Sequence, residues 1–161
     1  MSDRAPATCD LCDAHKGDID GSFRVLPPVF RDFGGRTAFH GPVSTVKCFE
    51  DNSMVKAAVE SPGQGRVLVV DGAGSLRRAL LGGNLGAAAA KNGWAGLVID
   101  GAVRDLAELA ACDIGIRALA PMPLPTERQG QGQGEGLPQR LAVAVRPGHW
   151  MEFGASSLVL H

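Results

Sequence analysis

Three short runs of mostly apolar residues, at positions 66–71, 94–100 and 115–119, constrain the fold of this chain more than any other feature. Such runs are typical of strands that are covered on both faces of a sheet. The segments between the runs, 85–92 and 106–111, carry helical patterns. The order strand, helix, strand, helix, strand predicts an α/β fold with a partly parallel central sheet and right-handed crossovers.

The rest of the chain carries shorter signals. A chain of 161 residues can bury a core of its own, so residues 1–161 are predicted to form a single domain. Asp51-Asn52-Ser53 is predicted to cap a helix over 54–60. Further expected elements are a helix at 8–14, a strand at 41–49, a turn leading into 76–81, a low-complexity Gly/Gln loop at about 126–140, and closing antiparallel strands at 141–145 and 157–160.

Charge and cysteine content exclude several classes of protein. Sixteen basic residues are balanced by 17 acidic ones, and without a basic excess we expect no direct nucleic-acid binding. No apolar run approaches the roughly 18–20 residues of a membrane-spanning helix, so we expect a cytoplasmic protein with no membrane contact. Of the four cysteines only Cys9 and Cys12 have a paired spacing, and no second pair completes a metal site. Free thiols in a reducing compartment are therefore expected.

A Gly-Ala-Gly segment at 72–74 follows a predicted strand, as the phosphate-binding turn of dinucleotide-binding proteins does. The third glycine of that fingerprint is replaced by Arg77, which removes the close packing of helix on strand. A structural turn is the preferred interpretation.

Two other segments carry residues that could bind a ligand or take part in a reaction. Residues 82–85 open a helix and residues 101–108 follow a strand, and open α/β sheets place ligands at such strand ends. Free N–H groups at a helix start favour a carboxylate or phosphate, and Arg104 would add a bidentate fork for the same anion. Asp105 offers a hard oxygen ligand for Mg²⁺ or Mn²⁺. On composition alone an Arg-Asp dipeptide is more often a surface ion pair, so both interpretations stay open here.

Several long motifs resemble those of a known family. These motifs lie at residues 33–36, at 41–43 together with 45–52, at 67–80, and from 91–94 onward to 101–105. With these motifs the chain resembles the regulator of ribonuclease activity A (RraA-like) family, which includes class II 4-hydroxy-4-methyl-2-oxoglutarate aldolases that also decarboxylate oxaloacetate. The resemblance is close from about residue 30 to residue 125. It implies a swivelling β/β/α fold and a homotrimer with sites at subunit interfaces.

The resemblance also implies roles for individual residues. The substrate-binding turn would be formed by Gly82, Gly83, Asn84 and Leu85. Arg104 would bind the substrate, Asp105 would hold the divalent cation, Mg²⁺ or Mn²⁺, and both would be catalytic. Glu108 matches a further acid that could orient water. The aldolase branch has an acidic residue where this chain has Gly83, and glycine cannot take over that role.

The function implied by the resemblance is a divalent-metal-dependent lyase acting on 2-oxo acids. It would release pyruvate by oxaloacetate decarboxylation and by aldol cleavage of 4-hydroxy-4-methyl-2-oxoglutarate. Only aldol cleavage needs a base, so Gly83 predicts weak aldol cleavage, and Gly83→Asp should raise the aldolase rate more than the decarboxylase rate. The exception would be a base supplied by Glu108, Asp100 or a residue of a neighbouring subunit.

Two alternatives stay open, a non-catalytic regulator that binds and inhibits a ribonuclease, and a structural trimer with a vestigial site. Asp105 favours the enzyme, because a binding surface needs no metal ligand.

Overall fold

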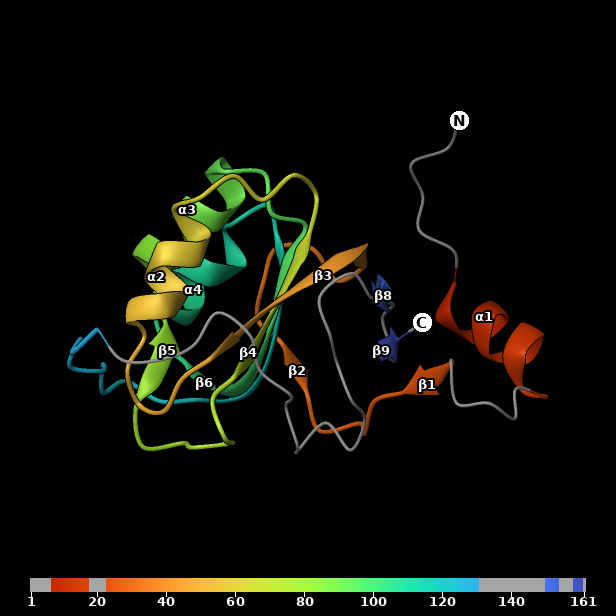
Figure 1. The fold of residues 1–161 in the computed structure, drawn as a ribbon, viewed down its shortest axis with the longest axis horizontal. Coiled ribbons are helices and arrows are strands. Elements are labelled where there is room, and N and C mark those ends of the chain that lie inside the picture. Colours follow the sequence, from red (N-terminus) through yellow and green to blue (C-terminus); the bar gives the residue numbers. More distant parts are fainter. Residues whose placement is uncertain (1–6, 18–22, 131–149, 154–157, 161) are drawn as a thin grey trace.

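The computed structural model describes residues 7–17, 23–130, 150–153 and 158–160 (Figure 1). Its elements in chain order are α1 (Thr8–His15), β1 (Arg24–Val25), β2 (Arg31–Asp32), β3 (Phe39–Lys47), α2 (Ser53–Val59), β4 (Val67–Asp71), β5 (Ala79–Leu81), α3 (Gly83–Lys91), β6 (Gly96–Val103), α4 (Leu106–Ala110), β7 (Gly115–Pro121), β8 (Trp150–Phe153) and β9 (Leu158–Leu160).

The core of the sheet is parallel. Strands β3, β4, β6 and β7 are neighbours in that order, with Val69 of β4 paired to Thr45 on one side and to Val98 on the other. The short strand β5 adds to β6 in the same direction. Every residue of β4 and β6 is buried, as expected for strands covered on both faces. The partly parallel α/β fold predicted from the apolar runs is confirmed.

Antiparallel strands extend the sheet at both edges. Strand β2 pairs with β7, while β8 pairs with β3, β9 with β8, and β1 with β9. The closing strand expected at 157–160 is present as β9, and the one expected at 141–145 lies outside the described residues. Strands β1 and β2 have two residues each, which is too short to leave an alternating pattern in the sequence.

Helices α2, α3 and α4 lie together on one side of the parallel strands (Figure 1). Their buried side chains, among them Val55, Leu85 and Leu109, join Leu97 of β6 in the main hydrophobic cluster. A smaller cluster around Phe39 covers the other face. Together the two clusters hold the ends of the parallel strands in place, which is what positions the site described below.

Some helix and strand boundaries in the structure differ from those expected from the sequence. Helix α3 begins at Gly83, two residues before its expected start, and β6 continues to Val103. Asn52 is the N-cap residue of α2, but its side chain makes no capping hydrogen bond. The Asp51 carboxylate instead accepts a hydrogen bond from the Ser53 N–H at 2.9 Å. Residues 126–130 contain no helix or strand, as a loop predicts, and 131–140 lie outside the described residues.

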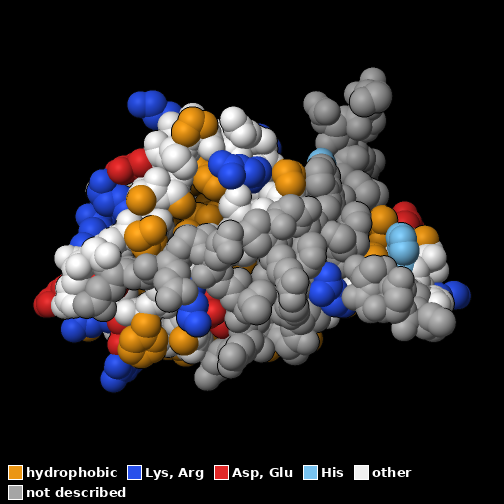
Figure 2. Space-filling view, viewed as in Figure 1, with side chains coloured by type: hydrophobic (Ala, Val, Ile, Leu, Met, Phe, Trp, Pro, Cys, Tyr) orange, Lys and Arg blue, Asp and Glu red, His pale blue; other side chains and the backbone are white. Residues whose placement is uncertain are grey.

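The surface agrees with the balanced composition. On the face drawn in Figure 2, basic and acidic side chains of the described residues are interspersed over the helical side of the molecule. No helix within the described ranges has both the length and the apolarity needed to cross a lipid bilayer.

Candidate functional site

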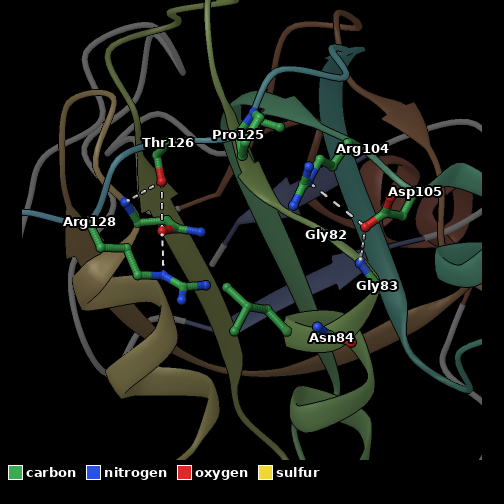
Figure 3. Close-up of a pocket in the computed structure, with 11 residues that line it drawn as sticks. Gly82, Gly83, Asn84, Arg104, Asp105, Pro125, Thr126 and Arg128 are labelled. Carbon is green, nitrogen blue, oxygen red and sulfur yellow. Dashed lines mark hydrogen bonds and ion pairs between the residues drawn. The ribbon is translucent and has the colours of Figure 1, made fainter.

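A pocket of about 340 Å³ opens where the parallel strands end (Figure 3). Apart from Ala79 of β5, its lining comes from the segments that follow the carboxyl ends of β3, β5, β6 and β7, the edge at which open α/β sheets bind ligands. The volume lies within the roughly 300–1,000 Å³ that small-molecule sites span. The pocket contains all of the predicted substrate-binding residues, Gly82, Gly83, Asn84, Leu85 and Arg104, together with Asp105.

One wall is the start of helix α3. Gly82 is its N-cap residue with extended backbone, and as a glycine it supplies no capping side chain. The first N–H groups of a helix have no partner within the helix. The Gly83 N–H donates to Asp105 Oδ2 at 2.9 Å, which leaves the N–H groups of Asn84 and Leu85 as the donors of this turn that could bind an anion.

Arg104 and Asp105 follow the end of β6. The Arg104 N–H donates to the Leu81 carbonyl at 2.9 Å, which ties this turn to the end of β5. Asp105 has φ +55°, a left-handed conformation that is uncommon outside glycine and that aspartate tolerates better than most residues. Arg104 Nε lies 3.9 Å from Asp105 Oδ2, and both side chains are about two-fifths exposed. The predicted pair is therefore brought together, half-buried, at the pocket mouth.

The glycines of α3 leave space for two carboxylates. A Cβ on Gly82 would lie 2.7 Å from Asp105 Oδ2. A Cβ on Gly83 would overlap Glu108 Oε2 and would lie 2.8 Å from Glu108 Cδ. The Glu108 carboxylate therefore occupies the space into which a side chain at position 83 would extend, although Glu108 itself is not a lining residue of the pocket. Asp100, the alternative base, is 2% exposed within β6 and does not line the pocket either.

The opposite wall contains residues that the sequence had not indicated as functional. Asn52, Thr126 and Arg128 line it (Figure 3). Asn52 Oδ1 accepts hydrogen bonds from Thr126 Oγ1 at 2.7 Å and from Arg128 Nε at 3.0 Å. These partners are 74 and 76 residues from Asn52 along the chain. Local sequence predicted a helix cap and a loop for these two segments, and no sequence signal links them.

The donor set suits a hard cation held by few protein atoms. Among the described residues, no group of three or more His, Cys, Asp or Glu side chains is placed to hold a metal ion, which disfavours a closed zinc-type site there. Mg²⁺ commonly takes one or two carboxylates and completes its coordination with water and substrate. Asp105, with its carboxylate at the pocket mouth and Glu108 one helical turn away, fits that mode.

Comparison with known proteins gives concordant results. The family model RraA-like (Aldolase/RraA) matches residues 8–153. A protein of Albidiferax ferrireducens named "Putative 4-hydroxy-4-methyl-2-oxoglutarate aldolase" is 68% identical over 162 residues, covering 96% of this chain and 94% of that protein. A Cupriavidus necator protein of the same name is 54% identical over 156 residues, with the same coverage of each.

Comparison with solved structures leads to the same family. One, described as "the RNA-processing inhibitor RraA from Thermus thermophilis", superposes with a TM-score of 0.89 at 44% identity, covering 99% of this chain and 93% of that one. Sequence, family model and fold coincide over nearly the whole length, so this chain belongs to the RraA-like family.

Proposed function

We propose that this protein is a divalent-metal-dependent lyase that acts on 2-oxo acids and releases pyruvate, by decarboxylating oxaloacetate and by aldol cleavage of 4-hydroxy-4-methyl-2-oxoglutarate. The observation that carries the proposal is the convergence, in one pocket, of the Arg104 guanidinium, the Asp105 carboxylate and the open start of helix α3. The aldolase name of the relatives at 68% and 54% identity supports it.

The head group of a 2-oxo acid has a carboxylate and an adjacent keto oxygen, and the pocket offers hydrogen-bond donors for each. The N–H groups of Asn84 and Leu85 would bind the carboxylate. Arg104 would donate to the keto oxygen, where negative charge develops as the enolate of pyruvate forms. Asp105 would hold Mg²⁺ or Mn²⁺, which when bound supplies Lewis-acid polarisation of the substrate carbonyl. The hydrogen bond from the Gly83 N–H keeps the Asp105 carboxylate directed toward the start of α3.

Glu108 is the proposed base for the aldol reaction. Aldol cleavage must remove the proton of the 4-hydroxyl group, whereas decarboxylation needs no such base. The acid expected at position 83 is absent, but the Glu108 carboxylate lies where that side chain would be. Both reactions are therefore assigned to this pocket, with Glu108 needed only for aldol cleavage.

The test measures pyruvate release from both substrates, with Mg²⁺ or Mn²⁺ and with a chelator, after subtraction of the metal-only rate for oxaloacetate. Arg104→Ala should lower both rates by about 10²- to 10³-fold. Asp105→Asn should remove the dependence on added metal. Glu108→Gln should lower aldol cleavage by about 10²- to 10⁴-fold and leave decarboxylation near wild type.

Glu60→Gln is the matched control, because Glu60 pairs with Lys56 on α2 and does not line the pocket. Its rates should equal those of wild type. Wild-type rates in Arg104→Ala would place the reaction elsewhere, and no pyruvate from either substrate with wild-type protein would refute the lyase.

A second candidate is a non-catalytic regulator that binds a ribonuclease. The likeness to a solved RraA structure described as an RNA-processing inhibitor favours it. Fold alone does not decide between the two functions, because function resides in the site. A ribonuclease activity that falls on addition of this protein, with no pyruvate released in the assay above, would support the regulator over the enzyme.

A further inference from the structure

Helix α1 carries two cysteines that the proposed reaction does not use. Cys9 and Cys12 are three residues apart within the helix and neither is in a disulfide. Cys9 is exposed and Cys12 is half-buried. Figure 1 shows α1 at the far end of the molecule from α3, whose start lines the pocket. The pair of thiols is therefore separate from the candidate active site.

The helical spacing sets the distance between the two thiols. Side chains three residues apart on a helix are neighbours, with Cβ atoms about 5–6 Å apart. A disulfide needs Cβ atoms about 3.5–4.5 Å apart, so closing one between Cys9 and Cys12 would distort the start of α1. A metal ion between the sulfurs adds two bonds of about 2.3 Å each, which fits the wider spacing. The intact helix therefore favours a bridging ion over a disulfide.

The two thiols have no further metal ligand beside them. Among the described residues, no third His, Cys, Asp or Glu side chain completes a metal-holding group with them. The histidine of the same helix, His15, is engaged elsewhere. Its Nδ1 donates to the Leu11 carbonyl at 2.9 Å, and its ring stacks on Phe23 with the ring centroids 4.5 Å apart. The donor set at this place is two sulfurs.

The number of donors selects the ion. Thiolates prefer soft ions, namely copper(I), zinc and the iron of iron–sulfur clusters. Structural zinc sites take four protein ligands, and iron–sulfur clusters are held by four cysteines as a rule. Copper(I) is a closed-shell ion that is stable with two thiolates in a linear arrangement. The exposed carboxylates of Asp10 and Asp13 on the same helix add electrostatic attraction for a cation.

We propose that Cys9 and Cys12 form a copper(I)-binding site on α1. Both thiols release their protons to solvent as the ion binds, and no electron is transferred. The ion would link the first two turns of a helix that has no side-chain cap at its start. Because Thr8 is buried and α1 contacts β9, the bound ion would also stabilise α1 where it packs on the sheet.

The test titrates the reduced full chain with copper(I) in the absence of oxygen, in competition with bicinchoninate, whose coloured copper(I) complex reports the metal that the protein leaves unbound. Wild-type protein should bind one ion per chain. Cys9→Ser and Cys12→Ser should each lower the affinity by more than the roughly 10- to 100-fold that is lost when a residue supporting a metal ligand is removed. Circular dichroism shows whether the variants are folded.

Cys112→Ser is the matched control, because it removes another half-buried thiol, just after α4. It should bind copper(I) as wild type does. Full affinity in folded Cys9→Ser or Cys12→Ser would overturn the proposal, and so would a zinc ion that displaces copper(I) at equal concentration. A mass that rises on copper loading in light scattering would also overturn it, because the ion would then bridge two chains. The lyase proposal does not depend on any of these results.

Discussion

Glu108 and Gly83 form the contact that most changes what is expected of this site. Sequence comparison alone treats Gly83 as a missing acid, and from it we predicted that Gly83→Asp would increase aldolase activity. In the structure, the space next to Gly83 already holds the Glu108 carboxylate. A new side chain at position 83 would therefore displace one acid in order to add another.

We accordingly expect Gly83→Asp alone to leave aldol cleavage equal to or below that of wild type. In a Glu108→Gly background, where the carboxylate and the Cβ that crowd this position are both removed, the same substitution should raise aldol cleavage above that of Glu108→Gly, by up to the roughly 10²- to 10⁴-fold of general-base assistance. Steady-state pyruvate release from 4-hydroxy-4-methyl-2-oxoglutarate measures both. An increase with Gly83→Asp alone would show that Glu108 is not positioned as the base.

Cys48 directly follows β3 and is 5% exposed. Burial raises the pKa of its thiol to about 12, with smaller contributions from Asp51 and Asp71. The thiolate is the reactive form, so native protein at pH 8 should alkylate at the exposed Cys9 and not at Cys48. Peptide mass spectrometry after brief iodoacetamide treatment measures this. Rapid labelling of Cys48 in folded protein would contradict the burial described here.

The same thiol makes stability depend on pH. Its folded pKa is raised above the ordinary value of 9.0, so the folded state keeps its proton while the unfolded state loses it. The free energy of unfolding should therefore fall as pH rises from about 9 to about 12, and should not change through this group below pH 8. Urea unfolding at stepped pH, compared with Cys48→Ala, isolates the contribution.

At the level of elements, three strands meet at the Phe39 ring. Gly96 of β6 and Gly115 of β7 are a paired register position, and a Cβ on either would overlap the ring of Phe39. Phe39 is 4% exposed and belongs to the smaller hydrophobic cluster. The two glycines thus let the aromatic ring of Phe39 pack directly on β6 and β7.

Gly115→Ala should lower the free energy of unfolding by about 1–3 kcal/mol, because the added methyl group overpacks a buried position. Gly17→Ala, where the new Cβ would meet nothing within 4 Å, should stay within about 0.5 kcal/mol of wild type. Chemical denaturation with unchanged m-values measures both. Equal stability of the two variants would mean that the Phe39 ring can move aside at little cost.

At the level of the molecule, the family resemblance predicts a homotrimer with sites at subunit interfaces. The flank of the site is compatible with a covering subunit, since Leu106 and Leu124 are 42% and 48% exposed. Light scattering at micromolar concentration should give three times the chain mass of 16.7 kDa, or a multiple of that value. A monomer under these conditions would refute the trimer and remove any contribution of a neighbouring subunit to the pocket.

The sequence by itself determined the parallel core and one wall of the pocket. Apolar runs separated by helices specify buried parallel strands, and residues that follow such strands gather at one edge of the sheet. That is why Gly82 through Leu85, Arg104 and Asp105 could be placed together from their positions along the chain.

Only the tertiary structure decided the rest of the site. Whether Glu108 fills the space at Gly83 depends on how α4 packs beside α3. Asn52 and Arg128, 76 residues apart, meet because the segments after β3 and β7 converge over the same strand ends. Local patterns report the conformation of neighbouring residues, whereas these contacts follow from the packing of distant elements, which no local pattern encodes.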